Sequence, residues 1–143
     1  MLIGEFTNQV GEKNRIAIPK KLREELGNKL VITQGYEGCL IVVSPVQWQT
    51  IIDESASGPF VSQSVRDTSR FLLGGALEVE LDDQGRFVLS QNLLEYGNIQ
   101  EEVVFLGLGR WVEIWDAKKW TDRKKYIGEH SSEIADTLSD IAL

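Results

Sequence analysis

The chain has 143 residues, of which 42% are hydrophobic and 26% charged, a composition typical of one globular domain and too short for two large ones. Its 15 lysines and arginines against 22 acidic residues give a net charge of −7, which excludes a uniformly basic nucleic-acid coat but permits a local basic patch. The lone Cys39 and lone His130 exclude an intramolecular disulfide, a multi-cysteine metal site and a histidine cluster.

Targeting and membrane signals are not found in the sequence. Residues 1–5 show no basic start followed by an apolar stretch, and no apolar run approaches the roughly 18 residues needed to cross a bilayer. Neither export nor membrane insertion is therefore expected, and a single cysteine in an apolar run, interpreted as a small buried hydrophobe, fits a reducing cytoplasm.

The first half of the chain predicts two strands around a turn, then a short helix, a hairpin and a final helix. Asn14 ends a turn-forming tripeptide, and Pro19 suits a first helical position. Ser44 followed by Pro45 marks the start of the last helix. In chain order we expect a hairpin turn at 12–14, a strand at 15–18, a helix at 20–26, strands at 30–33 and 40–43, and a helix from 45 onward.

A linker helix is predicted between the halves. The small and turn-forming residues at 55–59 break the preceding helix. Apolar positions with helical spacing then recur from about 61 to 73, and the Gly-Gly pair at 74–75 ends the helix.

The second half repeats the pattern of the first. Arg15 matches Arg86, 71 residues further on, and Trp48 matches Trp120, 72 residues further on. Gly85 takes the place of Asn14, and both residue types tolerate a left-handed backbone at a turn. The expected elements are a turn at 83–85, a strand at 86–89, a helix at 91–96 capped by Ser90, strands at 103–106 and 111–115, and a helix that begins at Asp116.

Neither half is expected to close a core alone, so the two halves should pack together about a pseudo-twofold axis. The tryptophans are interpreted as core or subunit packing rather than base stacking. The tail at 131–143 has Ile134, Leu138 and Ile141 at helical spacing, and it either packs on the body or frays.

Charge distinguishes the two halves. Around the first turn, five cations stand against one acid, Glu12, a local excess of four; these cations are Lys13, Arg15, Lys20, Lys21 and Arg23. The matching stretch 82–94 holds Arg86 against Asp82 and Asp83. A turn and helix start of this kind can follow a phosphate backbone, and arginines can add bidentate contacts. The alternative is a solvated surface in which the lysines are balanced by the neighbouring acids at 24–25.

One short motif resembles a known family. The stretch Asp82-Asp83-Gln84-Gly85-Arg86 resembles the D-x-x-x-R element of the MraZ family of bacterial transcription regulators, relatives of the AbrB-type swapped-hairpin DNA-binding proteins. The segment 66–76 looks like the linker helix of that family, and 15–23 looks like its opening hairpin. The likeness covers essentially the whole chain.

The resemblance implies a fold and an organisation. The expected class is α+β, mainly β, with two tandem AbrB/MraZ-like repeats packed as a pseudo-twofold, double-psi-like barrel. The whole chain, 1–143, forms one such domain. Its expected parts are repeat 1 at 5–54, the linker helix at 55–75, repeat 2 at 76–128 and a C-terminal tail at 129–143.

The resemblance also implies a function and its partners. The protein is expected to be a cytoplasmic, nucleoid-associated regulator of transcription. It would assemble into a ring-like homo-oligomer and bind double-stranded DNA at repeated promoter elements upstream of the division and cell-wall gene cluster. No cofactor, metal, small-molecule substrate or membrane contact is expected.

The expected DNA-binding residues are Lys13, Arg15, Lys20, Lys21, Arg23 and Arg86. Asp82 and Arg86 form the structural motif of the family. The first repeat departs from it, because Gly11 stands where the family has Asp. Our hypothesis is that Asp82 holds Arg86, whereas Arg15 lacks such a partner and is free to contact phosphates or bases.

The sequence also bears on two other classes of function. No catalytic nucleophile, metal set or cofactor motif is found, so the chain is not expected to be an enzyme. The alternative to a DNA-binding regulator is a non-enzymatic protein-interaction module, such as an AbrB-like antidote subunit whose acidic second half and amphipathic tail engage a partner protein.

Overall fold

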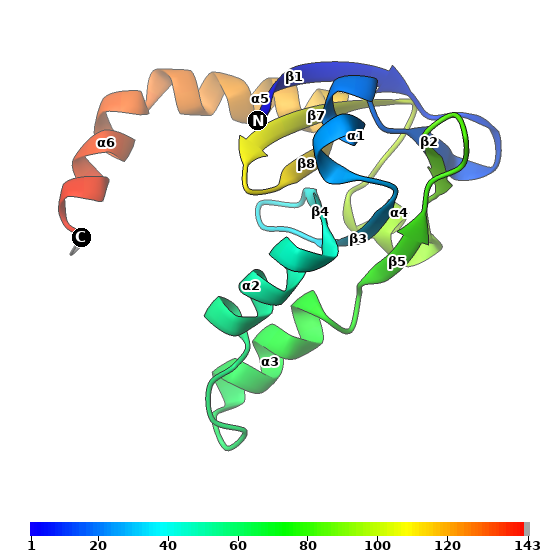
Figure 1. Ribbon diagram of the computed structural model, residues 1–143. Helices are drawn as coiled ribbons and strands as arrows, with labels where there is room; N and C mark the ends of the chain where they lie inside the picture. The colour runs from blue at the N-terminus through cyan, green and yellow to red at the C-terminus, as the bar shows by residue number, and fades with distance from the viewer. Residues whose placement is uncertain (142–143) are drawn as a thin grey trace.

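The structure is a computed structural model that describes residues 1–141. It contains two successive sets of strands and helices with a helix between them (Figure 1). The first set is β1 (Leu2–Gln9), the 3₁₀ helix η1 (Glu12–Asn14), β2 (Arg15–Ala17), α1 (Lys20–Leu26), β3 (Lys29–Gln34), β4 (Leu40–Val43) and α2 (Pro45–Ser55). After the linker helix α3 (Gln63–Leu72), the second set is β5 (Leu77–Glu80), β6 (Arg86–Val88), α4 (Gln91–Tyr96), β7 (Glu102–Gly109), β8 (Val112–Asp116), α5 (Ala117–Glu129) and α6 (Ser131–Ser139).

The strands of one half pair with those of the other. The six-stranded antiparallel sheet has the order β1-β7-β8-β4-β3-β5, and β2 pairs with β6 in a separate two-stranded ribbon. If each strand is exchanged for its counterpart in the other repeat, the result is the same order read from the opposite edge of the sheet. The strand order therefore has the expected pseudo-twofold symmetry and confirms an α+β fold of two tandem repeats.

Two features of the expected fold need correction. The main sheet is open, because β1 and β5 end it, so it is not a closed barrel. The turns are present, since the Gly11 amide donates to the Arg15 carbonyl at 2.8 Å and the Asp82 amide donates to the Arg86 carbonyl at 3.1 Å. However, the expectation that each turn joins the two strands of a hairpin is wrong: in the described chain, the strand after each turn pairs with its counterpart in the other half.

The core explains this cross-pairing. Ile16 and Phe87 lie directly opposite each other in the ribbon, and both are buried. They pack in one cluster with side chains from both main-sheet hairpins, including Ile32, Phe105 and Ile114. Burial of a large aliphatic or aromatic side chain contributes about 1.5–3 kcal/mol, so each half is stabilised by contacts that only the other half supplies.

A second, smaller cluster lies beneath α5. Cys39 and Trp115 are buried there, and Trp120 packs on Trp115 with ring centroids 5.4 Å apart. The prediction that Cys39 is a buried small hydrophobe is confirmed. The prediction that these tryptophans serve packing is confirmed for Trp115 and Trp120.

The short helices begin and end where the sequence predicts, at 20–26 and 91–96. The Ser44 hydroxyl accepts a hydrogen bond from the Gln47 amide at 3.3 Å, as expected of a helix N-cap. Ser90 occupies the N-cap position of α4, but its hydroxyl accepts no bond from that helix, so the predicted capping bond is not formed.

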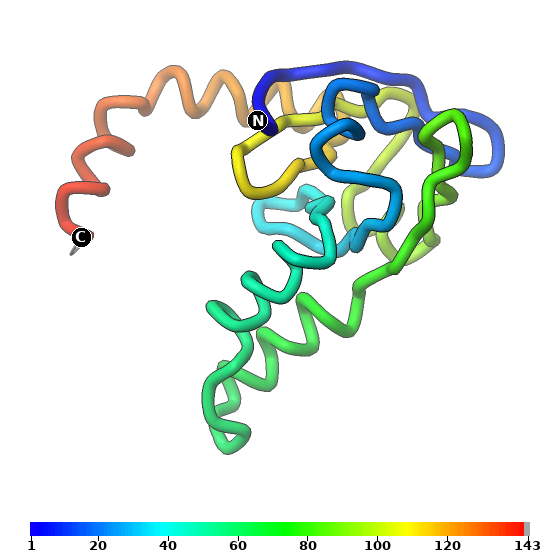
Figure 2. The backbone as a smooth tube through the Cα atoms, in the orientation of Figure 1, coloured from blue at the N-terminus to red at the C-terminus, as the bar shows by residue number. Residues whose placement is uncertain are grey.

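Two helical arms leave the sheet. The tube in Figure 2 shows α2 and α3 running out from the body and back to it, whereas α5 and α6 run away from it. Every residue from 131 to 141 is exposed. The tail is therefore helical up to Ser139 and does not pack on the body; positions 142–143 of the predicted tail lie outside the described residues.

Candidate nucleic-acid interface

The β2–β6 ribbon presents one face to solvent. Arg15 lies opposite Val88, and Ala17 lies opposite Arg86. Successive side chains of a strand point to opposite faces, so these four share the face that Ile16 and Phe87 do not occupy. Val88 is 51% exposed, which confirms that this is the outer face. The ribbon thus places the two equivalent arginines diagonally across one exposed surface.

Arg86 is held by the turn that precedes it. Asp82 Oδ1 accepts hydrogen bonds from the amides of Gln84 and Arg86, each at 2.9 Å, and its Oδ2 accepts one from Arg86 Nε at 2.9 Å. These bonds, that from the Arg86 amide first, lower the pKa of the Asp82 carboxyl from its usual value. The contact that the D-x-x-x-R motif implies is therefore present.

Arg15 has no such partner. Gly11 occupies the place of Asp82, and among residues 1–141 the Arg15 guanidinium forms no ion pair. The turn before it is shaped by Lys13 and Asn14, each with a φ of 58°, in the left-handed region. Left-handed backbone was expected at Asn14 and Gly85, and it is found at both; at Lys13 it was not foreseen.

A cavity of about 300 Å³ lies beside the two arginines. It is lined by Gln9, Gly11, Glu12, Arg15, Ala17 and Arg86. The backbone of each turn is tied to the other half, because the Ile18 amide donates to the Gly85 carbonyl and the Leu89 amide donates to the Asn14 carbonyl, both at 2.9 Å. The surface that carries the arginines is therefore fixed by main-chain bonds rather than by mobile loops.

The remaining predicted cations are distributed around this surface. Lys13 is exposed on the first turn, and Lys20 and Lys21 are exposed in the first turn of α1. Arg23 is half-buried and lies over the second turn, where a Cβ on Gly85 would overlap its guanidinium. The structure therefore brings Arg15 and Arg86 together, and it packs Arg23 against the turn that holds Arg86.

Two features of the surface are not evident from the sequence. Arg86 is among the predicted DNA-binding residues, but only the pairing of β2 with β6 shows that it shares a face with Arg15. The second feature is the basic character of α5, which holds five cations and two acids; the cations are Lys118, Lys119, Arg123, Lys124 and Lys125. The local charge count could have found this helix, but strand pairing is not visible in composition.

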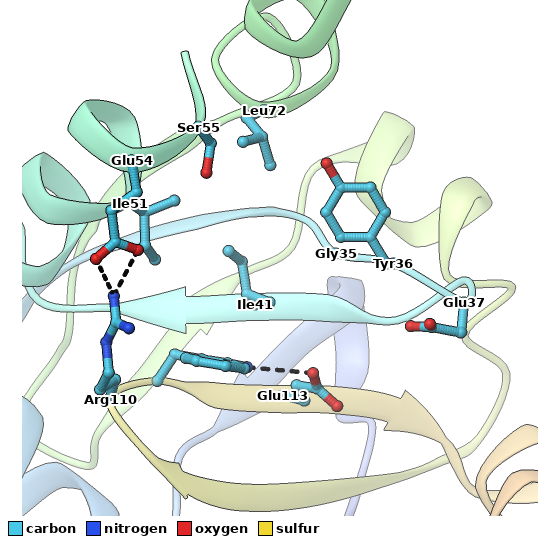
Figure 3. Close-up of a pocket in the computed structure, with 11 residues that line it drawn as sticks. Gly35, Tyr36, Glu37, Ile41, Ile51, Glu54, Ser55, Leu72, Arg110 and Glu113 are labelled. Atoms are coloured by element: carbon cyan, nitrogen blue, oxygen red, sulfur yellow. Dashed lines mark hydrogen bonds and ion pairs between the residues drawn. The ribbon is translucent and has the colours of Figure 1, made fainter. Parts of the chain in front are cut away.

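A different cavity, of about 480 Å³, lies between the helical arm α2–α3 and the main sheet (Figure 3). Arg110 closes one side by donating to both oxygens of Glu54, at 3.1 and 2.9 Å. The Trp111 indole donates to Glu113 at 3.2 Å. These bonds hold an arm and a strand in place and pair no nucleophile with a base, so the cavity does not resemble an active site.

In the part of the chain that the structure describes, no group of three or more His, Cys, Asp or Glu side chains could hold a metal ion. None of the helices in that part combines the length and the apolar character that crossing a membrane requires.

Comparison with known proteins identifies the family. The family described as "MraZ protein, putative antitoxin-like" matches the chain twice, at 1–71 and 72–140. A protein of Syntrophomonas wolfei named transcriptional regulator MraZ is 42% identical over the full length of both chains. Proteins of the same name from Clostridium beijerinckii and a Thermoanaerobacter species are 40% identical, again over the full length of both, and 38% identical over 99% of each.

The two family matches coincide with the duplicated strand order, and the relatives are named as regulators rather than enzymes. These names agree with the expectation that the chain is not an enzyme. The two repeats, the Asp82–Arg86 contact and the full-length relatives together show that the chain belongs to the MraZ family.

Proposed function

We propose that the protein regulates transcription by binding duplex DNA through the outer face of the β2–β6 ribbon, with Arg15 as the principal contact. The observation that carries this proposal is the unpaired Arg15 guanidinium beside Arg86 on an exposed ribbon. The names of the relatives, transcriptional regulator MraZ, support the same class of function.

The shape of the ribbon suits this role. The major groove of B-DNA, about 12 Å wide, admits a two-stranded β-ribbon whose side chains read base edges. A free guanidinium can donate two parallel hydrogen bonds to a guanine or a phosphate. Asp82 engages only Nε of Arg86, so the terminal nitrogens of Arg86 can add a second, more rigidly oriented contact.

The lysines contribute affinity rather than sequence preference. Lys13, Lys20 and Lys21 are exposed beside the ribbon, where they can neutralise phosphates. Because the whole chain carries a net charge of −7, repulsion elsewhere on the surface opposes indiscriminate binding. Binding should therefore weaken as salt increases, while the preference for the correct sequence persists.

Self-association completes the proposal. We propose a ring-like homo-oligomer, in the cytoplasm and associated with the nucleoid, that binds repeated promoter elements of the division and cell-wall gene cluster. One ribbon makes few contacts with DNA. When several ribbons are held in one assembly, binding of one raises the effective concentration of the others at neighbouring DNA repeats. Repeated elements would then be bound far more tightly than a single element.

The test compares two duplexes at two salt concentrations. Fluorescence anisotropy would measure the affinity of the wild-type chain and of Arg15→Ala for a duplex with the promoter repeats and for a scrambled duplex. We expect the wild-type chain to prefer the repeats at both concentrations and Arg15→Ala to lose specific binding. The control is Arg70→Ala, because Arg70 is an exposed arginine on α3 that pairs with Asp67. Unchanged specific binding by Arg15→Ala would contradict the proposal.

The interaction-module alternative predicts a different result. The exposed apolar side of α6 and the antitoxin-like description of the family favour it. An antidote subunit that acts through a partner protein would keep its regulatory activity when Arg15 is replaced. The same variant therefore discriminates between the two functions.

A further inference from the structure

The helices α3 and α6 occupy corresponding places in the two repeats. Each follows a helix that packs on the last hairpin of its repeat, α2 on β3 and β4 and α5 on β7 and β8. The family matches end at 71 and 140, so each match ends with one of these two helices. A difference between α3 and α6 is therefore a departure from the internal symmetry.

Helix α3 returns to the body. The Thr33 hydroxyl donates to the Leu72 carbonyl at 2.6 Å, and the Gln34 side chain donates to the Phe71 carbonyl at 3.1 Å. The Phe71 ring stacks on Tyr36 with centroids 5.2 Å apart. Leu72 is buried beside the cavity of Figure 3.

Helix α6 makes no comparable return. Its apolar side chains Ile134 and Leu138 and the following Ile141 lie on one side of the helix and are exposed, Leu138 by 56%. Figure 2 shows the helix extending away from the sheet. An amphipathic helix normally gains its stability by burying such a side against another element.

The connection before α6 explains why it cannot pack on its own repeat. Seven residues, 56–62, join α2 to α3, which allows the chain to turn back. Only His130 separates α5 from α6. Two antiparallel helices need a loop of about 2–5 residues, so α6 cannot fold back along its own α5.

The surface that would correspond to the α3 docking site is the outer side of β1 and β7. In the first half of the sheet, β5 follows α3 and pairs with β3. The counterpart of β5 is β1, and it pairs with β7, the counterpart of β3. Ile3 and Leu108 lie directly opposite each other there, and both are exposed, Leu108 by 44%. These large apolar side chains form a cross-strand patch without a covering helix in the described chain.

Contacts at the start of β1 also correspond to contacts at the end of α3. Phe71, near the end of α3, contacts the ring of Tyr96 at the end of α4, with centroids 5.8 Å apart. In the other half, the amino group of Met1 lies 2.9 Å from Glu25, near the end of α1. The start of β1 therefore lies where a preceding helix would end if the pattern of α3 were repeated.

Charge favours the same arrangement. Helix α6 and the residue after it carry three acids and no cation; the acids are Glu133, Asp136 and Asp140. The exposed face of β1 and β7 lies beside α5, whose five cations and two acids give it a net charge of +3. Lys124 of α5 already binds Glu5 on β1 at 3.3 Å, which places this basic helix against the outer side of that strand.

We propose that α6 of one copy docks on the β1–β7 face of a second copy, beside its α5, as α3 docks within the chain. This inference deepens the proposed self-association and rests on it. Each copy gives one helix and receives one, and such a head-to-tail contact closes into a ring when the rotation between copies allows it.

The test uses two full-length variants with one exposed leucine replaced in each. Leu138→Glu impairs the docking helix α6, and Leu108→Glu impairs the β1–β7 face on which it docks. Ser132→Glu adds the same charge to the opposite side of α6 and serves as the control. Light scattering after gel filtration, without DNA, gives the mass of each protein, and circular dichroism verifies that each is folded.

We expect the wild-type chain and Ser132→Glu to form the same oligomer, and each leucine variant alone to be monomeric. Mixing the two leucine variants restores one intact contact, so a complex of two chains should form. A monomeric wild-type chain, a Leu138→Glu protein of wild-type mass, or a mixture without the two-chain complex would overturn the inference. Because DNA is absent, these outcomes are independent of whether the ribbon binds DNA.

Discussion

Arg15 and Arg86 lie diagonally on one outer face of a two-stranded ribbon, but only Arg86 is held by a carboxylate. The pseudo-twofold symmetry makes the two positions equivalent, and among the differences between the two turns, Gly11 in place of Asp82 removes the carboxylate that would pair with Arg15. The ribbon therefore combines one preoriented guanidinium with one that is free to adapt to a ligand.

Restoring the missing carboxylate should weaken DNA binding. Gly11 has an extended backbone with a φ of −82°, so Gly11→Asp can adopt it and can engage Arg15 as Asp82 engages Arg86. Loss of one bidentate base contact costs roughly 1–3 kcal/mol, or about 5–150-fold in affinity for the specific duplex. A binding titration would measure this loss.

The control for that change is Gly11→Asn. Any side chain at position 11 places its Cβ about 3.2 Å from the Arg15 carbonyl oxygen, so both variants share this tight contact. Only the aspartate adds a charge that pairs with the guanidinium. Equal affinities for the two variants would argue against a role for the free Arg15.

The second turn should be sensitive to acid through Asp82. Hydrogen bonds from Arg86 and Gln84 lower the pKa of this carboxyl in the folded chain, so its stabilising effect is present above the unfolded pKa of roughly 4. That stabilisation is lost as the pH falls through the lower, folded pKa. We expect the melting temperature of the wild-type chain to exceed that of Asp82→Asn at neutral pH, and the difference to become smaller as the pH falls. A difference in melting temperature that does not depend on pH would argue against the charged Asp82 carboxylate as its cause.

The two repeats should unfold as one unit. Ile16 and Phe87 come from different repeats and fill one buried layer beneath the ribbon. Phe87→Ala should lower the free energy of unfolding by about 3–5 kcal/mol, because it removes a large buried side chain. Val88→Ala, on the exposed face, should change it by no more than about 0.5 kcal/mol.

Denaturant titrations followed by circular dichroism and by tryptophan fluorescence would check this prediction. Coincident transitions are expected, since neither half completes the core alone. Two separate transitions, with only the second affected by Phe87→Ala, would show that the repeats are independent.

Cys39 should be unreactive in the folded protein. Burial raises the pKa of its thiol well above the usual range, and the nearby carboxylates of Glu113 and Glu37 act in the same direction. Because the thiolate is the reactive species, a thiol reagent should label Cys39 rapidly only in denaturant. Rapid labelling without denaturant would mean that the second cluster opens readily.

Local features of the fold could be predicted well from the sequence. The bounds of α1 and α4 follow from flanking Pro, Ser and Gly residues, and the left-handed positions Asn14 and Gly85 follow from residue type. Such features depend on a few neighbouring residues, whose conformational preferences are strong. The duplication added the equivalence of Arg15 and Arg86.

Features that depend on distant pairing could not be predicted in this way. Nothing in the residues of β2 or of the turn before it shows that β2 pairs with β6 rather than with β1. The common face of Arg15 and Arg86 and the open sheet both result from that pairing. The position of Arg23 over Gly85 is likewise a contact between repeats, so its residue type alone indicated only a surface cation.

The most direct test of the central claim is the sequence preference of Arg15→Lys. Lysine keeps the positive charge but lacks the planar fork that donates two parallel hydrogen bonds. With the promoter repeats and a scrambled duplex in the same titration, we expect Arg15→Lys to bind the scrambled duplex as the wild-type chain does and to lose most of the preference for the repeats. A preference equal to that of the wild-type chain would contradict the assignment of Arg15 as the residue that reads DNA.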